Sequence, residues 1–374
     1  MESVRHAWPL AAYAACFAAC FVAILLVLTK DLHGRFSLDS VAGVQRVHTQ
    51  PTPRIGGLAL VGGVVLGMLL VEGEAHQLLW GIVLAGLPAF AFGLLEDFTK
   101  EVSVKTRLFA TMGSGLLGWF VTGAAITSAD MPLLDTLLLW TPFAVAFTAF
   151  AVGGMANAIN IIDGFNGLAS GALVIMLTGL GWLSVHLGDI QLGYVCLILA
   201  ASALGFLLVN WPFGKLFLGD GGAYFAGFAL AWVGVLLLQR HASVSAWCPL
   251  LMCSYPVIEV LYSIMRRTGA RRKAGQPDRL HLHSLVKRRF VRRLFPGASS
   301  LARNSITGAL MWLMALPGAV LAVAWHDDTL LLVLGLLACV ALYHAVYARL
   351  LRFRWCFPMP RRHPAALSHS ARKA

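Results

Sequence analysis

The stretch NAINIIDGFNGLASG, residues 157–171, lies between two long apolar runs and decides how this chain is organised. On a helix, residues three apart lie close together on one face. Gly164 and Gly167 then allow the backbone to leave helical geometry and approach a ligand. Taken alone, the stretch fits both a ligand-binding segment and a turn that caps two helices. Its polar residues recur at every third position: Asn157, Asn160, Asp163 and Asn166.

The composition indicates a polytopic membrane protein. Of the 374 residues, 59% are hydrophobic and only 12% are charged, and the mean hydropathy is +0.76. Soluble domains rarely have such a composition. The seven cysteines lie mostly within apolar runs, so we interpret them as small core residues and not as metal ligands.

Apolar runs divide the chain into about eleven expected transmembrane helices, since a span needs roughly 20 apolar residues. The first run follows a short basic segment without a clear cleavage site, and we interpret it as a retained helix. The sequence therefore predicts an all-α membrane protein. The runs cover residues 10–29, 56–71, 78–95, 108–127, 133–153, 168–187, 190–209, 221–239, 245–265, 306–325 and 329–348.

Lysine and arginine set the expected orientation. With the 30–55 loop in the cytoplasm, 27 of the 29 basic side chains fall on the cytoplasmic side, as the positive-inside rule requires. The amino terminus is then outside and the carboxyl terminus inside. The net charge of +12 thus reflects membrane orientation, and no nucleic-acid partner is expected. We expect one catalytic domain, residues 1–350, with a basic tail, 351–374, and cytoplasmic loops at 30–55, 96–107, 154–167, 210–220 and 266–305.

Three acidic motifs fall on this cytoplasmic face: Glu96-Asp97, Asp163 and Asp220. Acids at helix ends are often solvated caps. Neighbouring carboxylates also suit a hard divalent cation that keeps coordination sites for substrate phosphates. Asp220 stands among glycines where an apolar helix begins, and free backbone N–H groups there favour a phosphate.

Basic and imidazole side chains accompany these acids. Lys100 lies close to Glu96 and Asp97 and could bind diphosphate, or could only form helix ion pairs. The segment PDRLHLHSLVKRRF, 277–290, reads as a set of phosphate donors or as a solvated basic segment. Glu259 lies inside the ninth apolar run. A carboxylate at that depth needs a partner, and its role could be functional or structural.

Together the motifs resemble the MraY/WecA family of polyprenyl-phosphate N-acetylhexosamine-1-phosphate transferases. The resemblance spans residues 45–290, and it rests on five motifs in order: HTQPTPRIGG, GLLEDFTKEVSVKTRL, NAINIIDGFNGLASG, FLGDGGAY and DRLHLHSL. It implies ten or eleven helices, a cytoplasmic site and a Mg²⁺ ion, which Mn²⁺ could replace. The family transfers a sugar 1-phosphate from a UDP-sugar to a lipid phosphate and releases UMP.

The resemblance also implies roles for individual residues. Asp97, assisted by Glu96, would prepare the lipid phosphate, and Phe217 would stack on uracil. The residues it implies are Glu96, Asp97 and Asp163 as catalytic; Lys100, Asn160, Asn166, Phe217, Arg279, His281 and His283 as substrate-binding; and Asn157 and Asp220 as metal-binding.

Departures from the family pattern favour a WecA- or WbpL-like enzyme that initiates surface polysaccharide. Glu96 replaces an aspartate, Asn166 replaces a second aspartate, and Ser284 replaces a histidine. The expected partners are a UDP-N-acetylhexosamine, undecaprenyl phosphate and membrane lipid, and a homodimer is compatible with the sequence. The expected location is the bacterial inner (plasma) membrane. The competing hypothesis is a transporter of an anionic solute, although its ionisable groups would be expected near the bilayer midplane.

Overall fold

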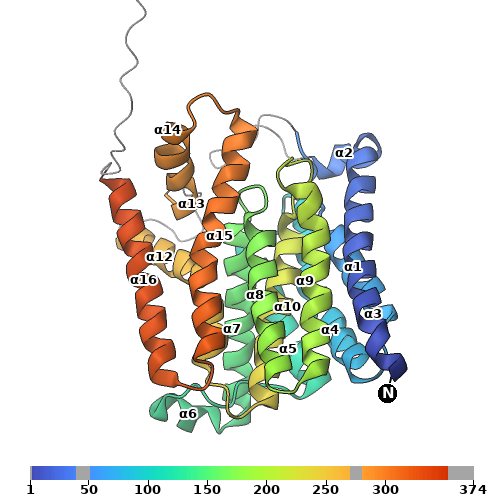
Figure 1. Ribbon diagram of the computed structural model, residues 1–374, viewed down its shortest axis with the longest axis vertical. Coiled ribbons are helices and arrows are strands. Elements are labelled where there is room, and N and C mark those ends of the chain that lie inside the picture. Colours follow the sequence, from blue (N-terminus) through green and yellow to red (C-terminus); the bar gives the residue numbers. More distant parts are fainter. Residues whose placement is uncertain (1, 39–50, 270–279, 353–374) are drawn as a thin grey trace, which may run out of the picture.

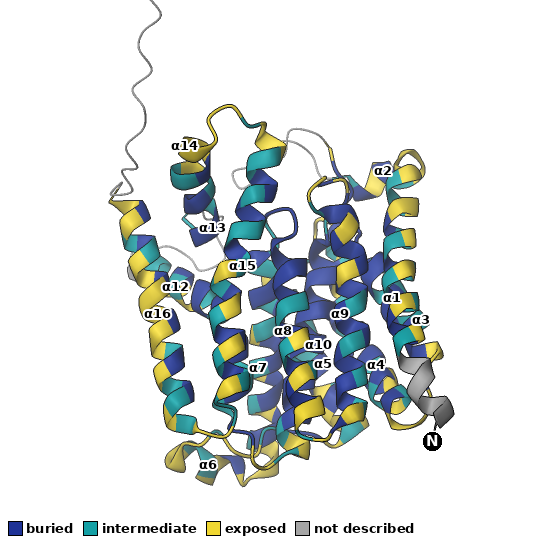
Figure 2. Cartoon of the chain, in the orientation of Figure 1, coloured by how far each residue is buried: buried dark blue, intermediate teal, exposed yellow. Residues whose placement is uncertain are grey.

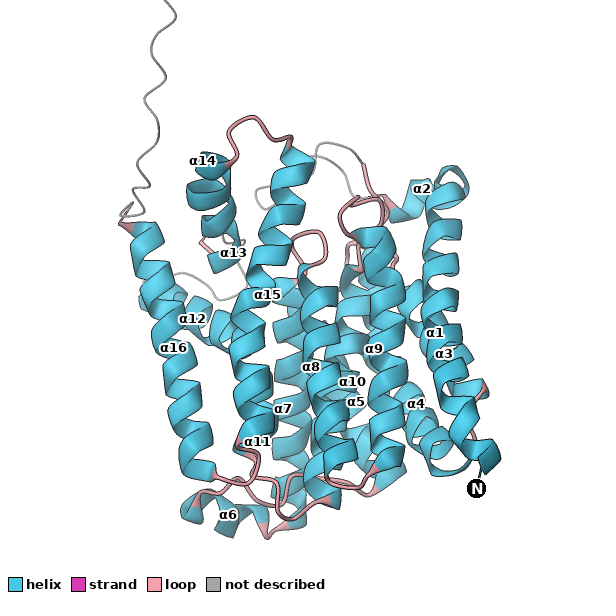
Figure 3. Cartoon of the chain, viewed as in Figure 1, coloured by secondary structure: helices cyan, strands magenta, loops and turns pink. Residues whose placement is uncertain are grey.

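In a computed structural model, the chain forms a bundle of helices (Figure 1). The structure describes residues 2–38, 51–269 and 280–352, and within these ranges the regular elements are all helical (Figure 3). The helices are α1 (Glu2–Leu28), α2 (Lys30–Ser37), α3 (Gly57–Leu69), α4 (Gly73–Thr99), α5 (Val104–Thr122), α6 (Pro132–Leu138), α7 (Thr141–Ile162), α8 (Leu168–His186), α9 (Ile190–Asn210), α10 (Gly219–Arg240), α11 (Trp247–Met252), α12 (Ser254–Gly269), α13 (Leu282–Leu285), the π-helix η1 (Val286–Val291), α14 (Arg292–Leu294), α15 (Ser300–Ala324) and α16 (Thr329–Leu351).

Eight of the described helices are long and apolar enough to cross a membrane, which confirms the predicted all-α polytopic class. The expected total of eleven spans is not confirmed. The orientation of the termini stays a prediction, because the structure contains no membrane. The eight spans are residues Pro9–Leu28 of α1 together with α4, α7, α8, α9, α10, α15 and α16.

The remaining three apolar runs fall short for different reasons. Helix α3 has only 13 residues, about 20 Å at the rise of an α-helix, whereas the hydrocarbon core is about 30 Å thick. Helix α5 has 19 residues, but Lys105, Arg107 and several hydroxyl side chains lower its hydropathy. The run 245–265 is divided at Cys253 into α11 and α12.

Helix α10 forms the centre of the bundle. In its membrane-spanning window 89% of residues are buried, against 22% for α16 at the edge, and Figure 2 shows the same gradient. Helices α3, α4, α5, α7, α8 and α9 all contact α10. Helix α10 is therefore surrounded by other described helices.

Glycines let three helices approach α10 at backbone distance. A Cβ atom added at Gly57 of α3 would lie 2.4 Å from the Gly222 nitrogen, and one added at Gly93 of α4 would lie 2.6 Å from the Gly221 Cα. On α10 itself, a Cβ at Gly227 would lie 2.6 Å from the Ala156 Cα of α7. Because lipid tails are as apolar as side chains, such close van der Waals packing drives helix association in membranes.

This contact predicts that Gly93→Ala destabilises the bundle. The added methyl group would meet the α10 backbone, and overpacking of this kind costs about 1–3 kcal/mol. Gly113→Ala is the matched control, since Gly113 also lies in a helix and a Cβ there meets nothing within 4 Å. We expect the apparent melting temperature in detergent to fall by several degrees for Gly93→Ala and to stay unchanged for the control. Equal melting temperatures would contradict the packing described here.

Candidate active site

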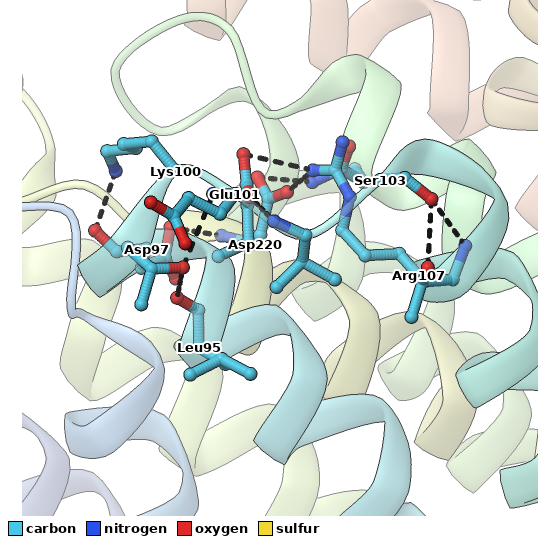
Figure 4. A network of polar contacts seen from close by, with 12 residues as sticks. Leu95, Asp97, Lys100, Glu101, Ser103, Arg107 and Asp220 are labelled. Carbon is cyan, nitrogen blue, oxygen red and sulfur yellow. Dashed lines mark hydrogen bonds and ion pairs between the residues drawn. The ribbon is translucent and has the colours of Figure 1, made fainter.

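The carboxylate of Asp97 holds the first turn of α10. Its two oxygens accept hydrogen bonds from the backbone N–H groups of Asp220 and Gly221, both at 2.9 Å, and the Asp97 side chain is buried. The first N–H groups of a helix have no partner within the helix and carry the positive end of its dipole. Asp97, at the end of α4, thus caps α10 from a neighbouring helix (Figure 4).

The side chain of Asp220 is surrounded by donors. Its Oδ1 accepts hydrogen bonds from Arg54 Nη2 and from Asn160 Nδ2, both at 3.1 Å. Its Oδ2 pairs with Arg107. Three residues distant in sequence, Arg54, Arg107 and Asn160, therefore meet at one buried carboxylate.

Hydrogen bonds hold the loop after α4 against the carboxyl-terminal end of that helix. Glu96 Oε2 accepts the Val102 N–H at 2.8 Å, and Glu96 Oε1 lies 3.9 Å from Arg107 Nη1. Lys100 has a left-handed backbone (φ 61°), and its Nζ donates to the Asp97 carbonyl at 2.6 Å. A lysine at this place completes the carbonyl end of α4, as Figure 4 shows.

Asp163 follows the last residue of α7 and lies within electrostatic range of this cluster. Burial raises the pKa of its carboxyl group to about 7, with Arg54 acting to lower it and Asp220 acting to raise it. A hydrogen bond with the Gly219 backbone also lowers it. The Asp163 carboxyl group is accordingly easier to protonate than that of an exposed aspartate.

The three asparagines of the 157–166 stretch have three different hydrogen-bond partners. Asn160 reaches Asp220, and Asn157 donates to the Gly153 carbonyl at 2.8 Å within its own helix. Asn166 is fully buried and donates to Ser305 Oγ at 3.0 Å. The structure therefore gives Asn166 a hydrogen bond to α15 in place of one to Asp220.

Phe217 is held near the cluster by its main chain. Its N–H donates to the Pro53 carbonyl at 2.9 Å, and its carbonyl accepts the Gly56 N–H at 2.9 Å. Phe217, whose aromatic side chain is half-buried, thus lies three residues before Asp220, with its main chain beside the segment that carries Arg54. Its stacking role stays a prediction.

Apart from the residues around Asp220, the site contains two stacked imidazole rings. The rings of His281 and His283 are 5.2 Å apart and 12° from parallel. Glu259, which is buried in α12, accepts His281 Nδ1 at 2.9 Å and the Leu282 N–H at 3.2 Å. The structure thus identifies the partner that a buried Glu259 needs, which is the histidine segment, and the bond leaves Nε2 of His281 for other contacts.

His283 faces the 157–171 stretch. A Cβ at Gly164 would lie 3.6 Å from His283 Nε2, and the His283 ring packs edge-on against Phe165 at 5.1 Å. Burial lowers the pKa of His283 to about 4, with Glu259 acting to raise it and His281 acting to lower it. His283 is accordingly neutral at pH 7. Its Nδ1 is buried and makes no hydrogen bond with the residues that the structure describes.

Arg279, the remaining predicted substrate-binding residue, lies outside the described residues. Three side chains belong to the site although the predicted set omitted them: Arg54, Arg107 and Glu259. Arg54 is separated from the glycine pair Gly56-Gly57 by one residue, and Arg107 lies in the motif that contains Asp97. These positions in the sequence are the features from which Arg54 and Arg107 could be predicted as site residues.

Comparison with known proteins decides the family. Residues 79–238 match glycosyl transferase family 4. A probable undecaprenyl-phosphate N-acetylglucosaminyl 1-phosphate transferase of Bacillus subtilis is 29% identical over 240 residues, 64% of this chain and 66% of that protein. A phospho-N-acetylmuramoyl-pentapeptide-transferase of Clostridium perfringens is 32% identical over 194 residues, 50% of this chain and 61% of that protein. A decaprenyl-phosphate N-acetylglucosaminephosphotransferase of Mycobacterium leprae is 30% identical over 278 residues, 63% of this chain and 67% of that protein. The chain belongs to glycosyl transferase family 4.

The glycosyl transferase family 4 match runs from α4 to α10. It therefore includes Asp97, Asn160 and Asp220, which the structure brings together. Arg54, Glu259 and the stacked histidines lie outside it. The chain spans 66% and 61% of the first two relatives described above.

The capping bonds of Asp97 predict that Asp97→Asn loses stability as well as activity. An amide offers one acceptor where the carboxylate offers two, so one buried N–H at the start of α10 loses its partner, at about 1–3 kcal/mol. Glu101→Gln is the control, because Glu101 is exposed in the same loop. Thermal unfolding of both variants measures the difference. A melting temperature for Asp97→Asn equal to that of the unchanged protein would refute the capping role.

Proposed function

We propose that this protein transfers an N-acetylhexosamine 1-phosphate from a UDP-sugar to undecaprenyl phosphate and releases UMP. The observation that carries the proposal is the Asp220 carboxylate at the start of α10, with Arg54, Arg107 and Asn160 gathered around it. The printed names of the relatives support the same class, since two are polyprenyl-phosphate N-acetylglucosamine phosphotransferases.

In the proposed reaction, an oxygen of the lipid phosphate attacks the β-phosphorus of the UDP-sugar. A new P–O bond forms, the bond from that phosphorus to the bridging oxygen breaks, and UMP leaves with that oxygen. Both substrates are anionic, so the protein must mainly position them and neutralise charge. Arg54 and Arg107 are suited to this because a guanidinium binds phosphate oxygens through two donors.

Exchange of partners would connect the observed ion pairs to this chemistry. In the structure, both arginines bind the carboxylate of Asp220. When a diphosphate enters, the arginines can bind its oxygens, and the carboxylate is then available to a cation. The Asp97 cap holds the Asp220 backbone while this exchange takes place.

The residues present fit a magnesium ion. Mg²⁺ prefers oxygen ligands and is often bound by one or two carboxylates together with substrate phosphates. Asp220 and the nearby Asp163 supply carboxyl groups, and Asn157 supplies an amide oxygen that its bond to Gly153 does not use. No group of three or more His, Cys, Asp or Glu that could hold a metal exists among the described residues, so phosphate oxygens would have to complete the proposed site. Mg²⁺ would neutralise charge on the diphosphate when bound.

The structure supports a positioning role for Asp97 in place of a direct role in preparing the lipid phosphate. Both of its oxygens already bond backbone N–H groups. Glu96 likewise bonds the following loop. The donor sugar and the polymer pathway follow from the sequence resemblance alone: we propose an N-acetylhexosamine that initiates surface or cell-wall polysaccharide.

The proposed reaction predicts release of UMP from UDP-GlcNAc that requires both undecaprenyl phosphate and Mg²⁺. Asp220→Asn should reduce turnover at least 100-fold, because the variant lacks the charge around which the site is built. Asp327→Asn is the matched control, since Asp327 is exposed and at the opposite end of the bundle. The purified protein would be assayed for UMP with and without chelator. Turnover of Asp220→Asn near that of the control would remove Asp220 from the mechanism.

We further propose that the protein resides in the bacterial plasma membrane with this site facing the cytoplasm. The proposal rests on the distribution of lysine and arginine. A reporter fused after residue 270 should be active as a cytoplasmic reporter, whereas one fused after Asp130 should be active outside. The opposite pattern at both positions would invert the topology and the location of the site.

A further inference from the structure

Lys287 is a half-buried cation that the proposed mechanism does not use. It lies on the π-helix η1, four residues after His283. Its Nζ is 5.5 Å from the centre of the Phe165 ring and 3.3 Å from Asn304 Oδ1. Short π-helical turns occur often at functional sites. The ammonium group thus lies against the segment that begins with Asp163 and Gly164.

Among the described residues, no carboxylate contacts Lys287. Its described contacts are a neutral amide oxygen and an aromatic face, and residues 280–326 contain no aspartate or glutamate. Burial, together with the charge of Arg303, lowers the pKa of Lys287 to about 8. A cation removed from water without an anionic partner is unfavourable. A site that keeps such a cation is suited to a ligand that brings a negative charge.

Through its contact with Phe165, Lys287 lies near the segment that interacts with the Asp220 cluster. Phe165, beneath the ammonium group, is two residues from Asp163, so their Cα atoms are at most about 7 Å apart. Asp163 interacts electrostatically with Arg54 and Asp220. His283, whose Nδ1 has no described partner, packs on the same phenylalanine. One short segment therefore separates the Arg54–Arg107 pair from the second cation.

We propose that Lys287 binds a phosphate oxygen of a substrate, with Phe165 and Asn304 holding its side chain in place. This inference rests on the proposed function, since it places a second cationic contact on the other side of the 163–165 segment. The phosphate could belong to the UDP-sugar or to the polyprenyl phosphate. Both present the same anionic oxygen, and the experiment separates them.

The first measurement uses inorganic diphosphate as the probe. Purified full-length protein in detergent is titrated with diphosphate, and the rise in melting temperature gives the half-saturating concentration. We expect Lys287→Met to raise that concentration about tenfold and Lys287→Arg to restore part of the affinity, because it keeps the charge. Arg292→Met is the matched control: it also removes one positive charge from the neighbouring α14, but Arg292 is exposed, and its value should stay within about twofold.

The second measurement identifies the source of the phosphate. In the transfer assay, a KM increase of about tenfold for UDP-GlcNAc alone assigns Lys287 to the donor, and the same increase for undecaprenyl phosphate alone assigns it to the acceptor. Either result supports the inference. If Lys287→Met fails to fold, Lys287→Gln preserves a polar partner for Asn304 and replaces it in both measurements.

Unchanged diphosphate binding and unchanged KM values in a folded Lys287→Met protein would overturn the inference while leaving the transferase proposal intact. Conversely, an unsubstituted protein that binds diphosphate through Lys287 but releases no UMP would overturn the proposed function and leave this phosphate contact standing. The two failures are therefore distinguishable.

Discussion

The hydrogen bonds from the Asp220 and Gly221 N–H groups to the Asp97 carboxylate join the end of α4 to the start of α10. Because α10 is the most buried span of the bundle, this joint fixes the site to the centre of the fold. Glycine makes the joint sterically feasible: a Cβ at Gly219, where φ is +76°, would lie 2.6 Å from Asp97 Oδ2. The same bonds give Asp220 a rigid backbone and leave its side chain to interact with Arg54 and Arg107.

Around this joint the site has two groups of side chains, separated by the 163–165 segment. One group consists of Asp220 and its arginines, and the other consists of the stacked imidazoles of His281 and His283. Glu259 on α12 holds His281 of the second group through a hydrogen bond. It lies outside the part of the chain that matches the family. Arginines thus lie in one group and imidazoles in the other, an arrangement that suits the anionic substrates of the proposed reaction.

The sequence was sufficient to predict the fold class and the motifs that converge, because apolar runs and glycine-flanked acids have local signatures. It did not predict which partner each acid takes. The expected role of Asp97 toward the lipid phosphate stays a prediction. Its bonds to the α10 backbone could not be predicted, because they depend on helix packing between residues 123 positions apart. Asn166 matched the three-residue period of its stretch and yet turns to Ser305, since α7 ends at Ile162 and the helical period ends with it. The expected count of eleven spans stays unconfirmed, because α3 is short, α5 carries Lys105 and Arg107, and the run 245–265 is divided at Cys253.

An experimentally determined structure with a UDP-sugar and Mg²⁺ bound tests the central claim most directly. The account predicts that the diphosphate lies against Arg54 and Arg107, that the cation contacts Asp220, and that Asp97 still accepts the N–H groups of Asp220 and Gly221. A diphosphate bound away from Asp220, or an Asp97 carboxylate released from α10 and bonded to substrate, would contradict it.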